Sequence, residues 1–236
     1  MRIFGLGIAR TTFVPPAFAG WSRLLTCARG SVLVRTPGST VAVFGDRGLF
    51  LSETSPEIVA RGQADIRILH TRLPARPGAV VRVTRLLSEI VERMVERGYL
   101  DPRVEPDRRI LEVAADEYDG LRDTDARLAL DHPAGSPVAF LTALWTTIPA
   151  PSVLEAASLL GCSTRTLARL FSNLTGVGAA TWRRRCVLTA AIAQIAAGAS
   201  VTEAALDADY ATASAFIGAC RREYGRTPHA FLRRTA

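Results

Sequence analysis

The chain has 236 residues, which is enough for two modest domains that each bury a core. Hydrophobic residues make up 48% of the sequence, as in globular proteins, and no apolar run is long enough to cross a bilayer. The formal net charge is +7, and its excess is uneven: residues 151–236 hold 10 arginines against 5 acidic residues, whereas residues 1–150 hold 19 against 17. This composition argues against a membrane protein, and the basic C-terminal segment is typical of a module that faces phosphates.

The first residues and the cysteines indicate the compartment. Met1–Ala9 is apolar, but Arg10 interrupts the run and Pro15-Pro16 follows, so we expect the first strand of a cytoplasmic domain and not a secretory signal. The four cysteines are scattered, without C-x-x-C spacing, and favour buried thiols in a reducing compartment. A redox-sensing pair between Cys186 and Cys220 is the alternative.

Residues 1–73 contain short β-prone runs that alternate with turn signals such as Pro37-Gly38 and Asp46-Arg47-Gly48. Short strands at this spacing predict a small β-sandwich or barrel. The expected strands are Trp21–Cys27, Ser31–Thr36, Thr40–Phe44, Gly48–Ser52, Glu57–Ala60 and Asp65–Arg72.

Helical periodicity begins after Pro77-Gly78. From Ala79 to Arg97 apolar residues recur at helical spacing, with charged residues between them. Two interpretations stay open: this stripe packs onto the β domain, or it pairs two subunits. Further along we expect a helix over Pro106–Leu121, a linker over Asp123–Ser136 and a helix over Pro137–Thr147.

The C-terminal part contains an internal duplication. The segment Ser152-Val-Leu-Glu155-Ala-Ala recurs 48 residues later as Ser200-Val-Thr-Glu203-Ala-Ala. In each copy the serine can cap a helix while the glutamate reaches back to the serine N–H. A turn follows each short helix, at residues 160–162 and 208–210. A further helix follows each turn and ends at Gly176 in the first copy and at Gly225 in the second. These glycines are 49 residues apart, one more than the serines, so we expect a one-residue insertion in the second turn.

Two short helices joined by a tight turn, with Gly161 free to adopt a positive φ, predict a helix-turn-helix unit. A helix over Ala179–Ala197 is expected to join the two units, with Gly198 as its stop. A spacer of this length spans roughly 28 Å, close to the ~34 Å repeat of one face of B-DNA. One chain could therefore enter two successive major grooves.

With these features the C-terminal part of the sequence resembles the AraC family of transcription regulators. The resemblance covers about residues 137–236. It rests on residues 161–171, 210–216 and 221–228, on Gly176 and on Trp182-Arg183. The preceding part is similar, more weakly, to the cupin-like domain of one subgroup of that family. The resemblance implies a small-molecule effector at this domain, pairing into a homodimer, double-stranded promoter DNA as a partner and contact with RNA polymerase.

In the first unit the second helix should begin at the N-cap Ser163, with Leu167, Leu170 and Phe171 towards the core. Arginine suits bidentate contact with guanine O6 and N7, so we predict base contacts by Arg165 and Arg169, with a phosphate contact as the alternative for each. The residues predicted to lie near the groove are Thr164, Arg165, Ala168, Arg169 and Asn173.

The second unit offers less to a base edge, because Ser214 corresponds to Arg165 and Gly218 to Arg169. We expect it to anchor on phosphates and to read little sequence. The predicted phosphate contacts are Thr212, Ser214, Arg221 and Arg222, with Arg183, Arg184 and Arg185 of the joining helix as further backbone contacts or, alternatively, as a solvated charge run.

Three residues depart from the family pattern in ways that weaken the expected second half-site contact. Asp209 stands where the second unit usually has glycine, Cys220 where it usually has phenylalanine, and Val187 at a commonly basic position of the joining helix. Asp adopts the left-handed turn less readily than glycine, and cysteine fills less of a core than phenylalanine.

A catalytic role for the β domain is not indicated. A cupin metal centre uses several histidines with a carboxylate, yet of His70, His132 and His229 only His70 falls in the β domain. No nucleophile elbow or phosphate-binding glycine loop is present. We therefore expect no metal, no cofactor and no catalytic residue.

The sequence predicts an α+β protein that acts as a sequence-specific DNA-binding regulator under effector control. Two alternatives remain: a metal-dependent cupin enzyme with an accessory helical domain, and an interaction protein with degenerate DNA binding. The expected parts are a cupin-like β-barrel or sandwich at 1–73, a helical dimerisation or linker region at 74–136 and an all-α DNA-binding domain at 137–236.

Overall fold

The computed structural model describes residues 2–9, 12–13, 15, 19–51, 56–60, 62–98, 100–124 and 126–232. The chain divides into two compact units. The first, here called the β unit, comprises Met1–Val32 and Val43–Ala126, and the second, the helical unit, comprises Leu33–Ala42 and Arg127–Thr235. Among the described helices none is both long and apolar enough to cross a membrane.

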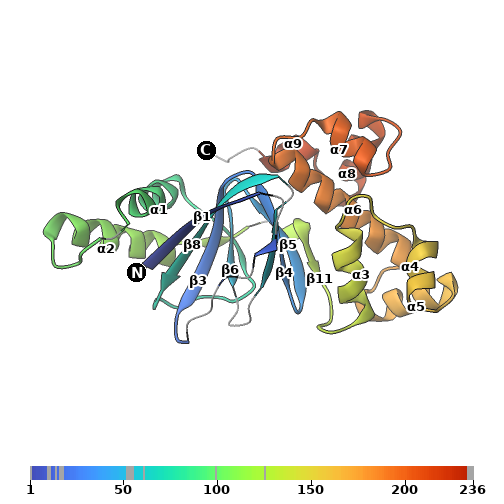
Figure 1. Ribbon diagram of the computed structural model, residues 1–236, viewed down its shortest axis with the longest axis horizontal. Coiled ribbons are helices and arrows are strands. Elements are labelled where there is room, and N and C mark those ends of the chain that lie inside the picture. The colour runs from blue at the N-terminus through green and yellow to red at the C-terminus, as the bar shows by residue number, and fades with distance from the viewer. Residues whose placement is uncertain are drawn as a thin grey trace. The chain divides into compact units, whose positions relative to one another are not determined.

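A six-stranded antiparallel sheet forms the main part of the β unit, in the order β1-β8-β3-β6-β9-β10 (Figure 1). Gly30, after β3, has a φ of +73°, and a Cβ there would lie 2.3 Å from the carbonyl oxygen of Gln63, so only glycine fits this turn. The strands are β1 Arg2–Ala9, β3 Ser22–Arg29, β6 Arg47–Leu51, β8 Gln63–Thr71, β9 Val80–Arg82 and β10 Arg122–Asp123; β2 Thr12–Phe13 pairs separately with β7 Glu57–Ala60.

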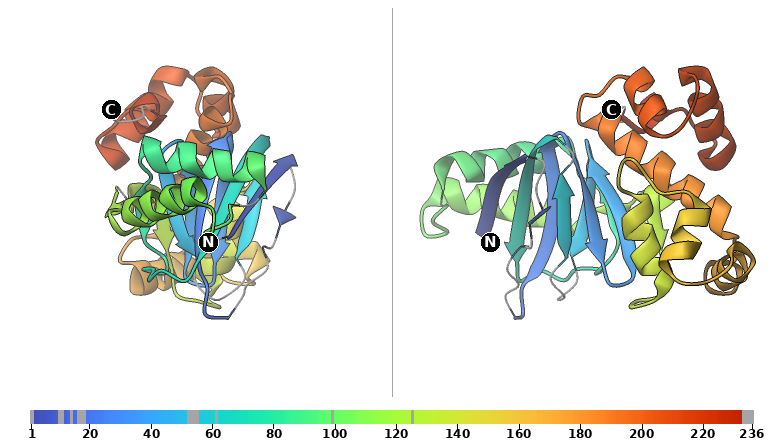
Figure 2. Two further views of the ribbon diagram at one scale, coloured as in Figure 1. Left: turned by 90° about the vertical axis from the view of Figure 1, so that its left-hand side faces the viewer. Right: turned by 45° about the vertical axis from the view of Figure 1, so that its right-hand side comes forward.

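Side chains alternate across this sheet. The helices α1 (Arg85–Arg97) and α2 (Glu105–Asp119) cover one face of this sheet (Figure 2). Leu24 of β3 belongs to the buried cluster that these helices form with the sheet, and so lies on that face. Arg23, one residue earlier, pairs with His70 in register and is only 2% exposed on the other face. The helical stripe of α1 is part of the core: its buried residues are Leu87, Ile90, Val91 and Met94. Packing onto the sheet is therefore what this stripe does.

The start of the helix predicted from Ala79 is wrong. Val80–Arg82 forms β9, which pairs with β6 on one side and β10 on the other, and the helix begins only at Arg85. The hydroxyl oxygen of Thr84 accepts a hydrogen bond from the backbone N–H of Leu87 (3.1 Å) and so caps α1. β-branched residues with a neighbouring strand to pair with favour the sheet over the first helical turn.

The helical unit includes a small β element. β4 (Ser31–Thr36) and β5 (Ser39–Phe44) form a hairpin whose residues 33–42 belong to this unit, and β11 (Ala129–Asp131) pairs with β5, with Leu130 opposite Thr40. The prediction that Asp123–Ser136 is only a linker is therefore wrong over β11 and over the 3-10 turn η1 (Ala126–Leu128). Three residues are too few to show a period in the sequence.

Seven helices follow in the described part of the helical unit. The α+β class, the two helix pairs and the joining helix are confirmed, whereas the described strands lie in open sheets and form no closed barrel. α6 packs against α3, α4, α5, α7 and α9. The helices are α3 Pro137–Trp145, α4 Val153–Leu159, α5 Thr164–Thr175, α6 Ala179–Ala196, α7 Val201–Asp207, α8 Ala213–Tyr224 and α9 Pro228–Leu232.

Candidate DNA interface

Each helix pair begins with the predicted capping box. In α4 the N–H of Glu155 donates to the Ser152 hydroxyl oxygen (3.2 Å), and the N–H of Ser152 donates to the Glu155 carboxylate (2.7 Å). In α7 the same two bonds join Ser200 and Glu203, at 3.1 Å and 2.8 Å. The backbone bond from the serine holds the pKa of each glutamate below its ordinary value, because it stabilises the charged carboxylate. The two pairs are thus started by identical local chemistry.

The first pair turns at Gly161, whose φ is +62°. Its N–H donates to the carbonyl oxygen of Ser158 (3.0 Å), and the N–H of Cys162 donates to that of Ala157 (3.0 Å). This Schellman arrangement satisfies carbonyl groups at the end of α4 and requires the left-handed conformation, which glycine adopts without steric cost.

The second pair repeats this turn with Asp209, the one non-glycine residue of the described part that has a positive φ, also +62°. The N–H groups of Asp209 and Tyr210 donate to the carbonyl oxygens of Leu206 (3.1 Å) and Ala205 (2.9 Å). Thr212 caps the next helix, three residues after Asp209, whereas Ser163 follows Gly161 by two. The predicted one-residue insertion is confirmed and lies between Asp209 and Thr212.

The buried face of α5 fixes which side of this helix is free. Leu167 and Phe171 are completely buried, and Leu170 is half-buried, as predicted. The Phe171 ring lies 5.2 Å from the ring of Trp145 and 6.4 Å from that of Trp182. Because α5 is anchored along one side, its opposite side faces solvent.

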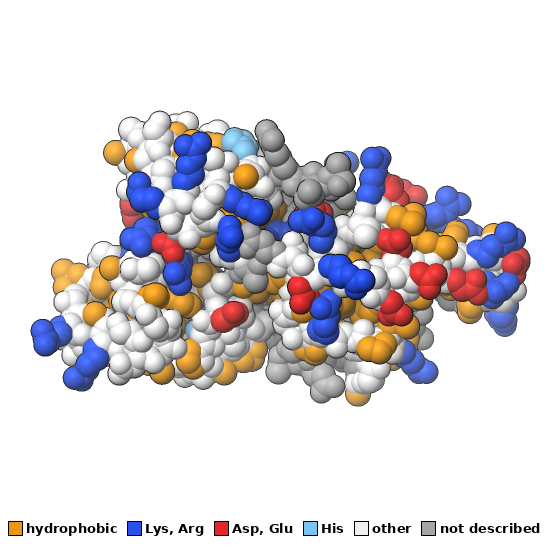
Figure 3. All heavy atoms as spheres, turned by 180° about the vertical axis from the view of Figure 1, so that it is seen from behind, with side chains coloured by type: hydrophobic (Ala, Val, Ile, Leu, Met, Phe, Trp, Pro, Cys, Tyr) orange, Lys and Arg blue, Asp and Glu red, His pale blue; other side chains and the backbone are white. Residues whose placement is uncertain are grey.

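The exposed side of α5 carries the residues predicted to read DNA. Arg165 and Arg169 are one helical turn apart, so both point to the same side. Within the described residues neither makes a hydrogen bond or an ion pair. Figure 3 shows basic side chains that project where α4 and α5 lie, with no acidic side chain beside them on that face. The residues exposed here are Thr164, Arg165, Ala168, Arg169 and Asn173.

The corresponding side of α8 has different chemistry. Ser214 is exposed, and Gly218 and Ile217 are half-buried, while Phe216 is completely buried in the core as predicted. Arg222 lies back along the helix, since a Cβ placed on Gly218 would be 3.4 Å from its Nη1 atom. This surface has few groups that could distinguish one base pair from another.

The three arginines at the start of α6 contact other parts of the helical unit. Arg183 donates from Nε to the carbonyl oxygen of Pro151 (2.7 Å) and from Nη2 to that of Ala150 (2.9 Å) and to the carboxylate of Asp209 (2.9 Å). Its side chain is 20% exposed. These three bonds hold the guanidinium group of Arg183 against the helical unit, so that little of the side chain faces solvent.

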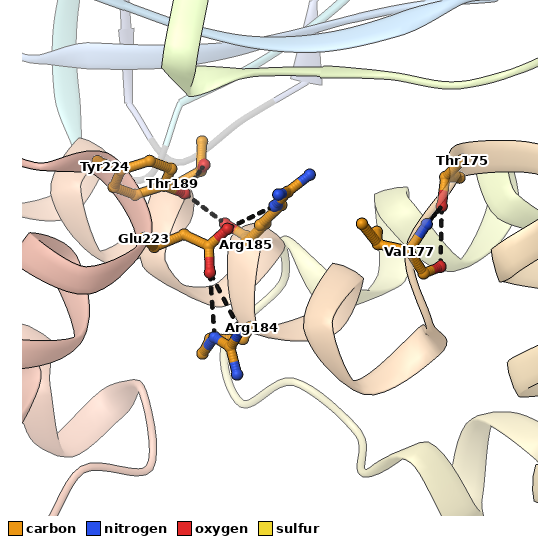
Figure 4. A network of polar contacts seen from close by, with 7 residues as sticks. All are labelled: Thr175, Val177, Arg184, Arg185, Thr189, Glu223 and Tyr224. Carbon is orange, nitrogen blue, oxygen red and sulfur yellow. Dashed lines mark hydrogen bonds and ion pairs between the residues drawn. The ribbon is translucent and has the colours of Figure 1, made fainter.

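Arg184 and Arg185 share the carboxylate of Glu223 on α8 (Figure 4). The Nε atom of Arg185 lies 2.6 Å from one oxygen of Glu223, and Nη2 of Arg184 lies 3.1 Å from the other. Burial alone would raise the pKa of Glu223, but the bonds from these arginines outweigh it and hold the pKa below its ordinary value. The Glu223 carboxylate therefore ties α8 to α6.

Sequence reasoning missed Glu223 and Arg127. Arg127 donates from Nη1 to the carbonyl oxygen of Tyr224 (2.6 Å), at the C-terminal end of α8. A cation there stabilises the negative end of the helix dipole. Glu223 is the single acidic residue in the segment 221–226, which also contains Arg221, Arg222 and Arg226, and this could have indicated an ion pair. Nothing in the sequence indicates the contact of Arg127.

The joining helix α6 sets the separation of the two units. Its 18 residues span about 27 Å at the usual rise of an α-helix. Eleven of these residues are buried, Val187 among them, so α6 forms the core of both pairs. The buried face of α6 is therefore wider than the apolar stripe that the sequence predicts. Cys220 is also completely buried, although smaller than the phenylalanine of the family pattern.

His70 and the four cysteines form no metal site in the described part of the chain. His70 is buried in the β unit, where burial and the nearby charge of Arg23 lower its pKa. The described residues include no group of three or more metal-binding side chains. All four cysteines are free, and burial raises the pKa of Cys27 and of Cys220 to about 12, so that their thiols stay protonated.

Comparison with known proteins identifies the C-terminal region. Residues 156–234 match the protein family described as "Helix-turn-helix domain". No curated protein sequence matches the chain.

Several solved structures are similar over most of the chain. ToxT from Vibrio cholerae O395 is 10% identical, with a TM-score of 0.38, over 98% of this chain and 96% of that one. Unsaturated fatty acid bound ToxT from Vibrio cholerae is 9% identical, with a TM-score of 0.35, over 98% and 93%. The AraC-like transcriptional activator CuxR is 16% identical, with a TM-score of 0.32, over 72% and 67%. Because these TM-scores are low, only the helix-turn-helix match bears on the function of the chain.

Proposed function

We propose that this protein, whose residues 156–234 form an AraC-type helix-turn-helix domain, is a transcription regulator that binds double-stranded DNA in a sequence-specific manner. The observation that carries the proposal is the outer side of α5, where Arg165 and Arg169 are exposed, one turn apart and unpaired within the described residues. A helix with two free arginines on one side, anchored by Phe171 on the other, has the form of a recognition helix.

The first unit supplies the selectivity in this proposal. Arg165 and Arg169 can each donate two hydrogen bonds to O6 and N7 of a guanine, and each such contact contributes about 1–3 kcal/mol of discrimination. Thr164 and Asn173, which are also exposed on α5, flank the two arginines and could add polar contacts in the groove.

The second unit anchors the domain on the DNA backbone. Thr212, Ser214, Arg221 and Arg222 are exposed, and their hydroxyl and guanidinium groups suit phosphate oxygens. Arg184 is about half exposed, at 48%, so its ion pair with Glu223 leaves room for a phosphate contact as well. Phosphate contacts set the register of a protein on DNA without specifying the sequence.

The N-terminal part of the chain would serve as the sensor. We assign it a small-molecule effector whose binding changes how the helical unit engages a promoter, together with homodimer formation and contact with RNA polymerase in the cytoplasm. The proposed parts are the sensor at 1–73, the helical dimerisation or linker region at 74–136 and the DNA-binding domain at 137–236. We propose no enzymatic role for either part.

The test is selection of binding sites from random duplex DNA with the full-length protein. The wild type should enrich a sequence with guanines at defined positions. Arg165→Ala and Arg169→Ala should each lose the preference at one position. The matched control is Arg109→Ala, an exposed arginine of α2, which should select the same sequence as the wild type. Enrichment of no sequence by the wild type would refute the proposal. Enrichment of the wild-type sequence by both Arg165→Ala and Arg169→Ala would refute the assignment of base contacts to these two residues.

A further inference from the structure

The structure assigns to Arg183 a role in positioning: it holds the second helix pair at a fixed place relative to the first, so that both units fit one DNA duplex. This inference rests on the proposed DNA-binding function and concerns its geometry. It replaces the sequence-based expectation that Arg183 contacts the DNA backbone.

The contacts of Arg183 reach both helix pairs from the helix between them. Two of its hydrogen bonds go to the carbonyl oxygens of Ala150 and Pro151, which directly precede Ser152, the N-cap of α4. The third goes to the carboxylate of Asp209, in the turn between α7 and α8. One planar guanidinium group, rigid in itself, thus fixes the start of the first pair and the turn of the second.

Asp209 is an unexpected residue for that turn. Its backbone hydrogen bonds repeat those of Gly161, and its φ of +62° is one that glycine adopts without strain. The turn itself therefore needs no carboxylate, and an aspartate there is less favourable than glycine. What the carboxylate adds is the 2.9 Å ion pair with Arg183, which glycine could not make.

A phosphate contact by Arg183 would compete with these bonds. Its side chain is 20% exposed, against 48% for Arg184, and two of its nitrogen atoms are already engaged. A residue that contacts phosphate and one that sets geometry differ in a measurable way. Loss of a phosphate contact reduces the slope of log affinity against log salt by about one, whereas loss of a positioning contact leaves that slope unchanged.

The test compares Arg183→Ala, Asp209→Gly and the double variant in the full chain. Asp209→Gly removes the carboxylate but keeps a residue that favours the turn, so the variant should fold. Binding is measured on two duplexes, one that covers both half-sites of the selected sequence and one cut back to the half-site of the first unit. Arg222→Ala, at an exposed arginine of α8, is the phosphate-contact control.

We expect each single variant to bind the long duplex about tenfold more weakly, as for one lost hydrogen bond to a charged group, with an unchanged salt slope. Asp209→Gly leaves the bonds of Arg183 to Ala150 and Pro151 in place, so it should bind the short duplex as the wild type does. The double variant should be no weaker than Arg183→Ala, because Arg183 and Asp209 act on the second unit through the same contact. Arg222→Ala should lower the salt slope by about one.

Two results would overturn the positioning role. In one, Asp209→Gly binds the long duplex as well as the wild type does. In the other, Arg183→Ala lowers the salt slope as the control does. If the wild type bound neither duplex, the proposed function itself would fail, and with it the role of Arg183; melting temperatures that still coupled Arg183 to Asp209 would then mark the contact as purely structural.

Discussion

The first helix pair, α4–α5, and the second, α7–α8, are built alike and expose different chemistry. Both start with a serine–glutamate capping box, both turn through a residue with a φ of +62°, and both bury one phenylalanine completely. On the outer side α5 presents two arginines that have no partner among the described residues, whereas α8 presents Ser214 and Gly218 at the equivalent positions. The shared parts are those that fold the unit, and the parts that differ are those that would meet DNA.

The largest effect that separates the two pairs should come from their core phenylalanines. Phe171→Ala and Phe216→Ala should each lower the free energy of unfolding by about 3–5 kcal/mol, because each removes a completely buried ring. The consequences for DNA should differ. Phe171→Ala should abolish sequence preference, while Phe216→Ala should weaken binding to all sequences alike.

Chemical denaturation and binding-site selection check this pair, with selection done at a temperature at which circular dichroism shows each variant folded. Loss of sequence preference in Phe216→Ala, with preference retained in Phe171→Ala, would reverse the assignment of the two units.

The comparison can be sharpened by giving α8 what it lacks. Ser214→Arg places an arginine at the position that corresponds to Arg165, on an exposed site. The variant should acquire preference for a guanine in the second half-site, with about 1–3 kcal/mol of discrimination. Ser214→Ala is the control and should gain none. A selected sequence that stayed unchanged in Ser214→Arg would show that α8 does not face a major groove.

The capping serines should behave as equals. Ser152→Ala and Ser200→Ala each remove the hydroxyl that accepts from the third helical residue, and each should lower the free energy of unfolding by about 1 kcal/mol. Thermal unfolding measures both. A much larger cost for one of them would mean that the two pairs are not equivalent in how they begin.

The pH dependence of stability should also be the same for both boxes. Glu155 and Glu203 have a folded pKa below the ordinary value of 4.5, so their contribution is present above about pH 4.5 and is lost as the pH falls through the folded value. Replacing both with Gln should flatten the fall of the melting temperature in acid. An equally steep fall in the double variant would assign the acid sensitivity to other carboxylates.

The features that the sequence predicts correctly are those held by interactions between residues close together in the chain. The capping boxes, the turn at Gly161 and the ends of α5 and α8 at glycine depend on residues within a few positions, and the sequence predicted each of them. The first unit's exposed side followed from the apolar period of α5 in the same way.

What the sequence did not predict depends on partners far along the chain. The apolar spacing extends the predicted helix over Val80–Arg82, since the strands that pair with this segment, β6 and β10, cannot be inferred from a local pattern. The partners of Arg183 and of Glu223 are set by the packing of α6 against the segments on either side of it. The arginine run on the predicted helix therefore indicates where positive charge lies, but it does not indicate which groups these arginines contact.

The most direct test of unequal units is methylation and ethylation interference on the selected duplex. Methylation of guanine N7 blocks contacts in the major groove, and ethylation of phosphates blocks contacts with the backbone. We predict N7 interference confined to the half-site under α5, where Arg165 and Arg169 would bind guanine, and phosphate interference alone under α8. N7 interference of equal strength in both half-sites would contradict the account.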